Sequence, residues 1–385
     1  MARPALELAD IVRQHGPEYR RRHDLTRAHL RLLRAIEVCR TAALGGHVER
    51  CGQCSHERIS YNSCRNRHCP KCQSPARAKW LAARKLELLP VTYFHVVFTL
   101  PKQIAAIAFH NKKVVYNLLF QAAAKTLLTI ARDPKHLGAD IGFFAILHTW
   151  GQNLLHHPHL HCVVPGGGLS LDHRRWVASR PGFFLPVRVL ARLFRRLFLK
   201  ALRQAYQRGQ LRFYGELEPL REPAAFGRYL APLQRLQWVV YAKPPFGGPE
   251  NVLEYLGRYT HRVAISNQRL LAHDGSRVSF SWKDYRHHDQ RKTMTLTAEE
   301  FLRRFLLHAL PPGFQRIRHY GLFANRYRRG NLSRCRQLLA APEPPAEAEA
   351  TAATAPGHEF RACPVCGSMA MFVIELLPPA WCDSS

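Results

Sequence analysis

The stretch that decides the fold reads HTWGQNLLHHPHLHCVVPGG and runs from His148 to Gly167. It places four histidines within six positions, then becomes apolar and ends in glycines. The apolar run predicts a buried strand, along which successive side chains alternate between the two faces. His159 and His161 are therefore expected on one face, with Leu160 on the core face. Because unpaired imidazoles are costly to bury, this spacing predicts a divalent metal site.

The segments around this stretch alternate between strand and helix patterns. Apolar and β-branched runs predict strands at 92–101, 142–150 and 237–245, and the 142–150 strand is expected to form a hairpin with the histidine strand. Helices are expected at 103–131, across most of 180–209 and from Thr297, which we predict to be an N-cap, towards Pro311. Asp274-Gly275 predicts the turn of another hairpin at 269–285.

A pair of tyrosines lies downstream in EYLGRY. Tyr255 and Tyr259 are four residues apart in a predicted helix at 249–264, so they share one face. Aromatic core packing is the commoner role of such a pair. The polar and basic surroundings, with Arg258 and Arg262, instead suit a surface that meets DNA, and a tyrosine hydroxyl is a competent nucleophile towards a phosphodiester.

A cysteine-rich block precedes the strands. Cys51 and Cys54 form one C-x-x-C pair and Cys69 and Cys72 form another, which is the spacing of a tetrahedral thiolate zinc site. We predict these four as ligands of a structural Zn²⁺. Cys64 and His68 lie between the pairs and are alternatives, either as replacements for one ligand or as parts of a second site. Arg65 and Arg67 flank the block and are predicted to contact nucleic acid.

The C-terminal region has a different composition. Residues 341–357 are rich in Ala, Pro and Glu and predict a disordered linker. The tail at 358–385 contains the pair Cys363 and Cys366, which resembles half of a zinc site, with Cys335 and Cys382 as possible partners.

Charge indicates the class of partner. The chain has 57 Lys and Arg against 27 Asp and Glu, a formal net charge of +30, which favours a polyanion such as nucleic acid. No apolar run of membrane-spanning length and no signal-peptide core is present, so no membrane contact is expected and the clustered cysteines favour metal over disulfides.

Taken together, these motifs resemble the HUH superfamily of single-strand nucleases. More narrowly, the chain resembles the two-tyrosine, rolling-circle transposases of insertion sequences. The resemblance spans YNSCRNRHCPKCQ, HPHLHCVVPGGG, YLGRYTHRVAIS and GLFANRYRRGNLSRCRQLL. It implies an α+β fold, in which a helical region with a zinc ribbon precedes a ferredoxin-like nuclease domain with an antiparallel sheet.

The resemblance also implies roles for single residues. His159 and His161 would bind a catalytic Mg²⁺ or Mn²⁺, and Tyr255 and Tyr259 would be the nucleophiles. Gln152 stands where a third metal ligand is expected, with His148 and His157 as rivals. The arginine-rich segment around Tyr327 would bind DNA through Arg326 and Arg328.

These expectations combine into one hypothesis. Residues 1–90 form the helical zinc-binding region and 91–340 the nuclease domain of a bacterial, cytoplasmic, nucleoid-associated transposase. Its substrates are single-stranded or hairpin DNA at the element ends and the target DNA. No P-loop motif is present, so a host helicase or the replication machinery would open the strands.

Three alternatives remain open at this point. One is a plasmid replication initiator or relaxase with the same chemistry, and another is a zinc-ribbon DNA-binding protein without catalysis. A zinc hydrolase is the third, although its histidines normally have the helical spacing of H-E-x-x-H.

Overall fold

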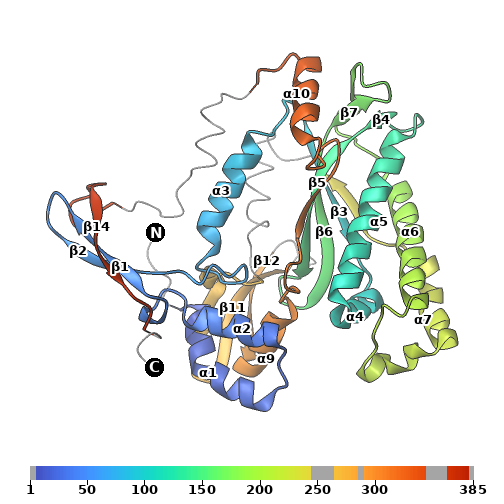
Figure 1. Cartoon of the computed structure of the whole chain (residues 1–385). Coiled ribbons are helices and arrows are strands. Elements are labelled where there is room, and N and C mark those ends of the chain that lie inside the picture. Colours follow the sequence, from blue (N-terminus) through green and yellow to red (C-terminus); the bar gives the residue numbers. More distant parts are fainter. Residues whose placement is uncertain (1–5, 244–263, 285–289, 344–361, 381–385) are drawn as a thin grey trace.

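The computed structural model describes residues 6–243, 264–284, 290–343 and 362–380 (Figure 1). The helices in chain order are α1 (Leu8–Arg22), α2 (Arg27–Glu37), α3 (Gln73–Lys85), α4 (Lys102–His110), α5 (Lys112–Arg132), α6 (Val187–Gln207), α7 (Pro223–Arg235), α9 (Ala298–Leu307) and α10 (Arg328–Leu338). The strands are β1 (Gly46–Cys51), β2 (Glu57–Tyr61), β3 (Tyr93–Thr99), β4 (Ala139–Asp140), β5 (Gly142–Trp150), β6 (His156–Pro165), β7 (Gly167–Ser170), β8 (Trp176–Ala178), β9 (Val240–Lys243), β10 (Leu270–His273), β11 (Arg277–Asp284), β12 (Gln290–Thr297), β13 (Ile317–Gly321) and β14 (Met371–Leu377).

The central sheet has the strand order β13-β5-β6-β3-β9, and every neighbouring pair is antiparallel. Helices α4 and α5 connect β3 to β5, and α6 and α7 lie between β6 and β9, which makes a βαββαβ unit. The order β5-β6-β3-β9 is the ferredoxin-like arrangement, and β13 extends it beside β5. The predicted α+β class with an antiparallel ferredoxin-like sheet is confirmed.

One face of the central sheet carries the main hydrophobic core. Phe98, Leu160 and Val164 from the sheet are fully buried against the helix residues Tyr116 and Phe194. The crossover helices cover this face because the connections of a βαββαβ unit lie on the same side of the sheet (Figure 1). At the end of β6 the glycine run permits close backbone approach, since a Cβ on Gly168 would lie 2.2 Å from the Asp140 carbonyl oxygen.

Among the described residues, helix α3 covers part of the opposite face of the sheet. Phe144, Ile146 and Val163 on this face pack against Trp80 and Leu81 of α3. Farther along the same strands, His148 of β5 and His159 and His161 of β6 lie on this face.

A second core joins the N-terminal helices to residues 264–309, which lie between β9 and β13 along the chain. Helices α1 and α2 pack against β11 and α9, with residues such as Leu33, Phe280 and Phe301 fully buried. The Leu8 amide donates to the Asn267 side-chain oxygen at 3.1 Å. The N-terminal helices therefore share a core with residues 264–309, a long-range association that the sequence pattern did not predict. The domain boundary at residue 90 stays a prediction.

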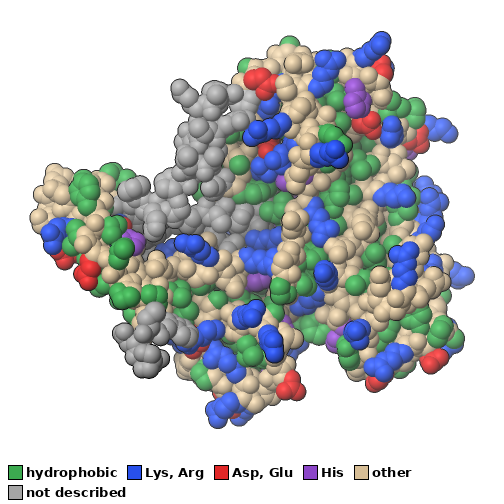
Figure 2. All heavy atoms as spheres, in the orientation of Figure 1, with side chains coloured by type: hydrophobic (Ala, Val, Ile, Leu, Met, Phe, Trp, Pro, Cys, Tyr) green, Lys and Arg blue, Asp and Glu red, His purple; other side chains and the backbone are tan. Residues whose placement is uncertain are grey.

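Two smaller sheets complete the described structure. Strands β4, β7 and β8 form one beside the end of β6, and β14, β1 and β2 form the other. Figure 1 shows the β14-β1-β2 sheet projecting away from the central sheet. Lys and Arg side chains are spread over the visible face of the molecule, with few Asp and Glu among them (Figure 2).

Several local predictions are confirmed. Strands β5 and β6 form the expected hairpin, and β10 and β11 form another around Asp274-Gly275, where Gly275 has a φ of +93°. Thr297 caps α9 by accepting a hydrogen bond from the Glu300 amide. The helix expected at 103–131 is instead two helices that meet at Asn111, whose side chain bonds to Ile107 and Arg212 main-chain groups.

Helix α5 is the one helix in the described part of the chain that is long and apolar enough to cross a membrane. In the structure 61% of its most apolar window is buried, and it packs on the sheet beside α6. Its composition is therefore explained by its position in the core.

A buried neutral histidine, His308, connects the end of α9 to the β5–β6 turn, and its burial makes the stability of the fold depend on pH. His308 is 2% exposed, its Nε2 donates to the Leu154 carbonyl at 3.0 Å, and its Nδ1 lies 3.2 Å from the Thr149 hydroxyl. Burial, reinforced by His156, lowers the pKa of His308 well below its usual value. The unfolded chain therefore takes up this proton below about pH 6.5 and the folded protein does not, so stability is lost as pH falls.

We expect the His308→Gln variant to lose less stability than the wild type between pH 7.5 and 5.5, by about 1.4 kcal/mol in the free energy of unfolding. Denaturant unfolding at the two pH values measures this difference. The same loss in both proteins would show that His308 does not titrate on unfolding.

Candidate functional site

The register of the β5–β6 hairpin brings three histidines onto one face of the central sheet. His148 of β5 pairs directly with His159 of β6, and Ile146 pairs with His161. Opposite residues in an antiparallel pair share a face, and so do residues two apart on one strand. His148, His159 and His161 therefore lie together, on the face opposite to the helices α4, α5 and α6.

The three imidazoles are close enough to bind one metal ion. One ring nitrogen from each lies within 4.8 Å of the others, and the ring centroids are 4.4 to 5.5 Å apart. His148 and His161 are 2% and 7% exposed, and His159 is half-buried. A metal at about 2.1 Å from each nitrogen requires nitrogen separations of roughly 3.0–3.5 Å, which fall within the 4.8 Å limit found for the three nitrogens.

Hydrogen bonds hold the two β6 rings by their Nδ1 atoms. His159 Nδ1 donates to the His157 carbonyl at 2.6 Å, and His161 Nδ1 lies 2.7 Å from His95 Nε2. The His95 and His161 rings are nearly parallel, with centroids 4.9 Å apart. Because these contacts use Nδ1 in both rings, Nε2 is the atom through which each ring would bind a metal. Such outer contacts orient metal-binding imidazoles in known sites.

Burial keeps these histidines neutral. Desolvation lowers the pKa of His159 and of His95 to about 4, and it lowers the pKa of His161 well below its usual value, helped by His148 and His159. Neutral imidazole is the form that binds metals. The donor set fits a divalent cation, and three imidazoles without a carboxylate favour Mn²⁺ over Mg²⁺ because the smaller, harder Mg²⁺ prefers oxygen.

The other histidines of the cluster have different positions. His156 is turned to the helices, where its Nε2 lies 2.8 Å from the Tyr116 hydroxyl and its Nδ1 faces the Ala105 carbonyl at 3.2 Å. His157 is exposed and contributes its carbonyl to His159. Gln152 lies in the β5–β6 turn, and its carbonyl accepts a bond from Arg269. Of the three residues considered for a third ligand, the structure places His148 in the cluster.

The predicted nucleophiles lie outside the described residues. Tyr255 and Tyr259, together with Arg258 and Arg262, belong to the segment 244–263, so their roles stay predictions.

The cysteines require a correction of the predicted ligand grouping. Cys51, Cys54, Cys69 and Cys72 do not come together, because each C-x-x-C pair belongs to a different group of four. Cys69 and Cys72 lie with Cys39 and Cys64, whereas Cys51 and Cys54 lie with Cys363 and Cys366. The spacing of two pairs predicts that a thiolate site exists, but it does not identify which pairs share it.

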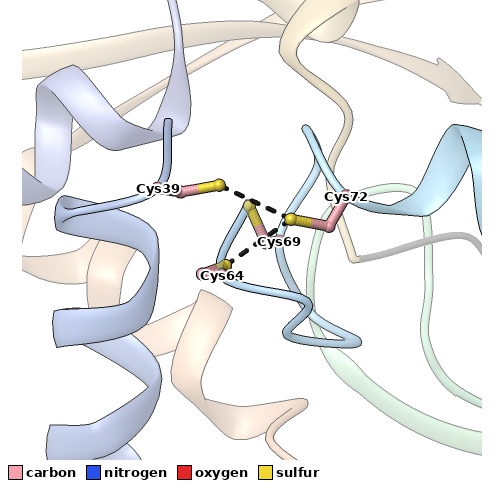
Figure 3. Close-up of side chains that lie close together, drawn as sticks. All are labelled: Cys39, Cys64, Cys69 and Cys72. Atoms are coloured by element: carbon pink, nitrogen blue, oxygen red, sulfur yellow. Dashed lines mark hydrogen bonds between the residues drawn. The ribbon is translucent and has the colours of Figure 1, made fainter. Parts of the chain in front are cut away.

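The first of these groups, Cys39, Cys64, Cys69 and Cys72, is shown in Figure 3. The Sγ of Cys72 lies 3.5 Å from that of Cys39 and 3.6 Å from that of Cys64. Four sulfurs at about 2.3 Å from a tetrahedral Zn²⁺ lie roughly 3.8 Å apart, so the geometry fits zinc. Cys39 follows α2 directly, and sequence analysis overlooked it because it stands alone, without a nearby cysteine.

His68 and Arg67 connect this cysteine loop to the segment after α9. His68 Nε2 accepts the Leu310 amide at 3.3 Å, and Arg67 donates to the carbonyls of Phe314 and Pro311 at 2.5 and 2.6 Å. Burial lowers the pKa of His68 to about 3, which keeps it a neutral acceptor. These contacts give His68 and Arg67 a structural role in docking the loop.

The remaining arginines predicted to bind DNA differ in exposure. Arg65 and Arg326 are exposed, and the Arg326 guanidinium stacks on the Tyr327 ring at 5.4 Å. Arg328 is half-buried and forms an ion pair with Glu87 at 3.1 Å. Arg65 and Arg326 are thus better placed for phosphate contacts than Arg67 and Arg328.

A basic groove lies along α6, beyond the main core. It has a volume of about 810 Å³, and its cationic lining residues are Arg192, Arg195, Arg196, Lys200 and Arg203. Helix α6 contains no Asp or Glu. Because α6 covers the helix face of the sheet, this groove is on the other side of the sheet from the histidines.

Two family models match the chain. One, described as "Putative transposase", matches residues 142–330 and so includes β5, β6 and their three histidines. The other, described as "Transposase zinc-binding domain", matches residues 11–100 and so includes Cys39, Cys64, Cys69 and Cys72.

Named relatives agree with these models. The chain is 59% identical over its whole length to the full-length "Putative transposase y4qJ" of Sinorhizobium fredii (strain NBRC 101917 / NGR234). It is 29% identical to the "Transposase for insertion sequence element IS801" of Pseudomonas savastanoi pv. phaseolicola, across 76% of this chain and 72% of that protein. No solved structure matches the chain.

The histidine geometry predicts which residue is the third ligand. We expect His148→Ala to weaken Mn²⁺ binding by more than the roughly 10–100-fold that loss of an outer contact causes, and Gln152→Ala to leave binding unchanged. His157→Ala is the matched control, because the exposed His157 ring lies beside His159 but is not one of the three imidazoles whose nitrogens converge. Mn²⁺ titration followed by electron paramagnetic resonance measures the affinities. Strong loss in Gln152→Ala with none in His148→Ala would reverse the assignment.

Proposed function

Because the chain belongs to the insertion-sequence transposases with an N-terminal transposase zinc-binding domain, we propose that it cuts and rejoins single-stranded DNA at the ends of its element by tyrosine attack beside a histidine-bound metal. One observation carries this proposal. His148, His159 and His161 converge on the face of the central sheet opposite to its helices, in the region that the transposase model matches.

The histidines supply a fixed site for a phosphate. His148, His159 and His161 would hold a Mn²⁺ or Mg²⁺, which would supply polarisation of the scissile phosphate and stabilisation of the leaving 3′-oxygen. The imidazoles are neutral before binding, so the site gains net positive charge with the ion and attracts the phosphodiester. His95 acts through His161, whose ring orientation it holds.

The tyrosines supply the nucleophile. The hydroxyl oxygen of Tyr255 or Tyr259 attacks phosphorus and forms a 5′-phosphotyrosine bond, and the bond from phosphorus to the 3′-oxygen breaks. The tyrosine hydroxyl gives up its proton and the leaving oxygen takes one up, so the released end is a 3′-hydroxyl. Attack of a 3′-hydroxyl on the phosphotyrosine reverses these steps and joins a strand. Two tyrosines allow two linked transfers, one at each end of the exchanged strand.

DNA is bound largely through charge. The net charge of +30 supports many phosphate contacts, and Tyr327 with Arg326 offers a stacking surface for an unpaired base. We assign the α6 groove to a DNA segment distinct from the one being cut, since the sheet separates it from the histidines. The substrates are single-stranded or hairpin element ends and target DNA in the bacterial nucleoid, with strands opened by a host helicase or by replication.

The zinc-binding domain has a structural part in this proposal. We assign Cys39, Cys64, Cys69 and Cys72 as the ligands of one Zn²⁺, a closed tetrathiolate site with no position for a substrate. Arg67 and His68 from the same loop then hold the domain against the segment after α9.

The decisive test uses the tyrosines. We expect the Tyr255→Phe, Tyr259→Phe double variant to form no covalent adduct with labelled single-stranded element ends, because Phe lacks only the nucleophilic oxygen. DNA binding should survive, and the two single variants should differ, one blocking cleavage and the other strand transfer. Denaturing gels measure the adduct, and Tyr214→Phe, at an exposed tyrosine elsewhere, is the control.

Excess Mn²⁺ distinguishes the loss of a metal ligand from the loss of a nucleophile. It should partly restore cleavage to His159→Ala, and it should not restore the tyrosine variants, since no ion supplies a nucleophile. An adduct in the double variant would refute the nucleophile assignment, and DNA binding without any cleavage by the wild type would favour a non-catalytic DNA-binding protein.

The α6 groove makes a separate prediction about salt. We expect Arg192→Ala with Arg196→Ala to flatten the dependence of duplex-DNA affinity on salt, by roughly 0.9 log units per log unit of salt for each lost phosphate contact. Fluorescence anisotropy over a salt series measures the slope. Arg21→Ala with Arg22→Ala removes the same charge from α1 and is the matched control. Equal slopes in the two double variants would exclude the groove as a DNA-binding surface.

A further inference from the structure

The second group of cysteines joins segments from the two ends of the chain. Cys51 ends β1 and Cys54 lies in the turn before β2, whereas Cys363 and Cys366 precede β14. Their Sγ atoms all lie within 4.8 Å of one another, with 3.5 Å between Cys51 and Cys366 and 3.6 Å between Cys54 and Cys363. From this arrangement we propose a second structural zinc site, which fastens the C-terminal segment to the N-terminal hairpin.

The two cysteine pairs have the same backbone conformation. The Cys51 amide donates to the carbonyl five residues on, at His56, and the Cys363 amide donates to the carbonyl of Ser368 in the same way. The Ser55 and Gly367 amides return hydrogen bonds to the carbonyls of Cys51 and Cys363. Ser55 and Gly367, each four residues after the first cysteine of its pair, both have a left-handed φ, of 60° and 74°.

The repeated turn therefore presents two thiolates from each segment to one point. In the first turn, the Gln53 amide also donates to the Cys51 sulfur at 3.4 Å. Two identical C-x-x-C turns facing each other supply the four ligands of a closed tetrahedral site.

The sulfur distances favour a metal over disulfides. A disulfide needs its sulfurs about 2.05 Å apart, whereas sulfurs that share a tetrahedral Zn²⁺ lie roughly 3.8 Å apart. The distances of 3.5 and 3.6 Å are close to the second value, and each sulfur has three others nearby instead of one.

The energetics of the β14-β1-β2 sheet also call for a metal. Its buried apolar cluster consists of Cys51, Cys363 and Met371, and two of these are cysteines. On β14 itself Phe372, Val373 and Leu376 are 59%, 56% and 78% exposed, so apolar burial contributes little to holding the strand in place. Sheets with so small a core are marginal in water unless a metal or covalent link stabilises them.

A zinc ion at this site would close a loop of several hundred residues. The strand β14 pairs antiparallel with β1 from Gly46–Leu377 to Cys51–Met371, which places the turn before β14 beside the β1–β2 turn. Figure 1 shows β14 in one sheet with β1 and β2, although these strands come from opposite ends of the sequence. The zinc-binding domain is thus completed by a segment beyond the residues 11–100 that its family model matches.

The test counts zinc in the full-length protein. We expect two Zn²⁺ per chain after purification without added metal, and one in the Cys54→Ser, Cys366→Ser double variant. Both substituted cysteines are exposed, so the core is not disturbed. Cys335→Ala, at a buried cysteine outside both groups, should retain two. One zinc in the wild type, or two in the double variant, would overturn the proposal.

A second measurement needs no variant and covers the case in which the double variant does not fold. In the wild type, Cys54 and Cys366 should resist alkylation by N-ethylmaleimide until a zinc chelator is added, as read by peptide mass spectrometry. Immediate alkylation with zinc present would show that the thiols hold no metal. Alkylation that requires a reductant instead of a chelator would show disulfides, and either result refutes the site.

Discussion

The register of the β5–β6 hairpin is the constraint on which the site depends. It sets His148 opposite His159 and keeps His161 on the same face, and a slip by one residue would turn the β6 imidazoles towards the helices. Apolar burial enforces this register, because the alternate residues Leu160 and Cys162 are fully buried in the main core. The same periodicity that builds the core therefore aligns the candidate metal ligands.

The second core secures the turn of this hairpin. Arg269 donates to the Gln152 carbonyl, Arg304 to that of Asn153 and His308 to that of Leu154, so three consecutive carbonyls of the turn are held from outside the sheet. These side chains come from the β10–β12 and α9 region, which packs on α1 and α2. The N-terminal helices thus contribute to the histidine site indirectly, by supporting the residues that clamp its turn.

The zinc-binding region is integrated into the molecule by the same kind of contact. Arg67 and His68 of the Cys64–Cys72 loop bind main-chain groups between Leu310 and Phe314, and Lys112 donates to the carbonyls of Leu307 and Ala309. Charged side chains that satisfy carbonyls at the end of a helix are effective links, since each such bond is charge-assisted. Part of the arginine content therefore serves the architecture, and the remainder is available for DNA.

By itself, the sequence determined those features that depend on near neighbours. The alternation in HPHLHCVVP predicted a strand with two histidines on one face, Asp274-Gly275 predicted a hairpin, and Thr297 predicted a helix start, because side-chain direction, turn geometry and capping are set within a few residues. Only the tertiary structure decided which distant groups meet. Strand pairing places His148 beside His159 as the third imidazole. Packing brings Cys39 close to Cys64 and Cys363 close to Cys51, and it directs Arg67 to main-chain carbonyls of the protein. Spacing along the chain carries no information on such contacts, since they follow from how separate elements pack.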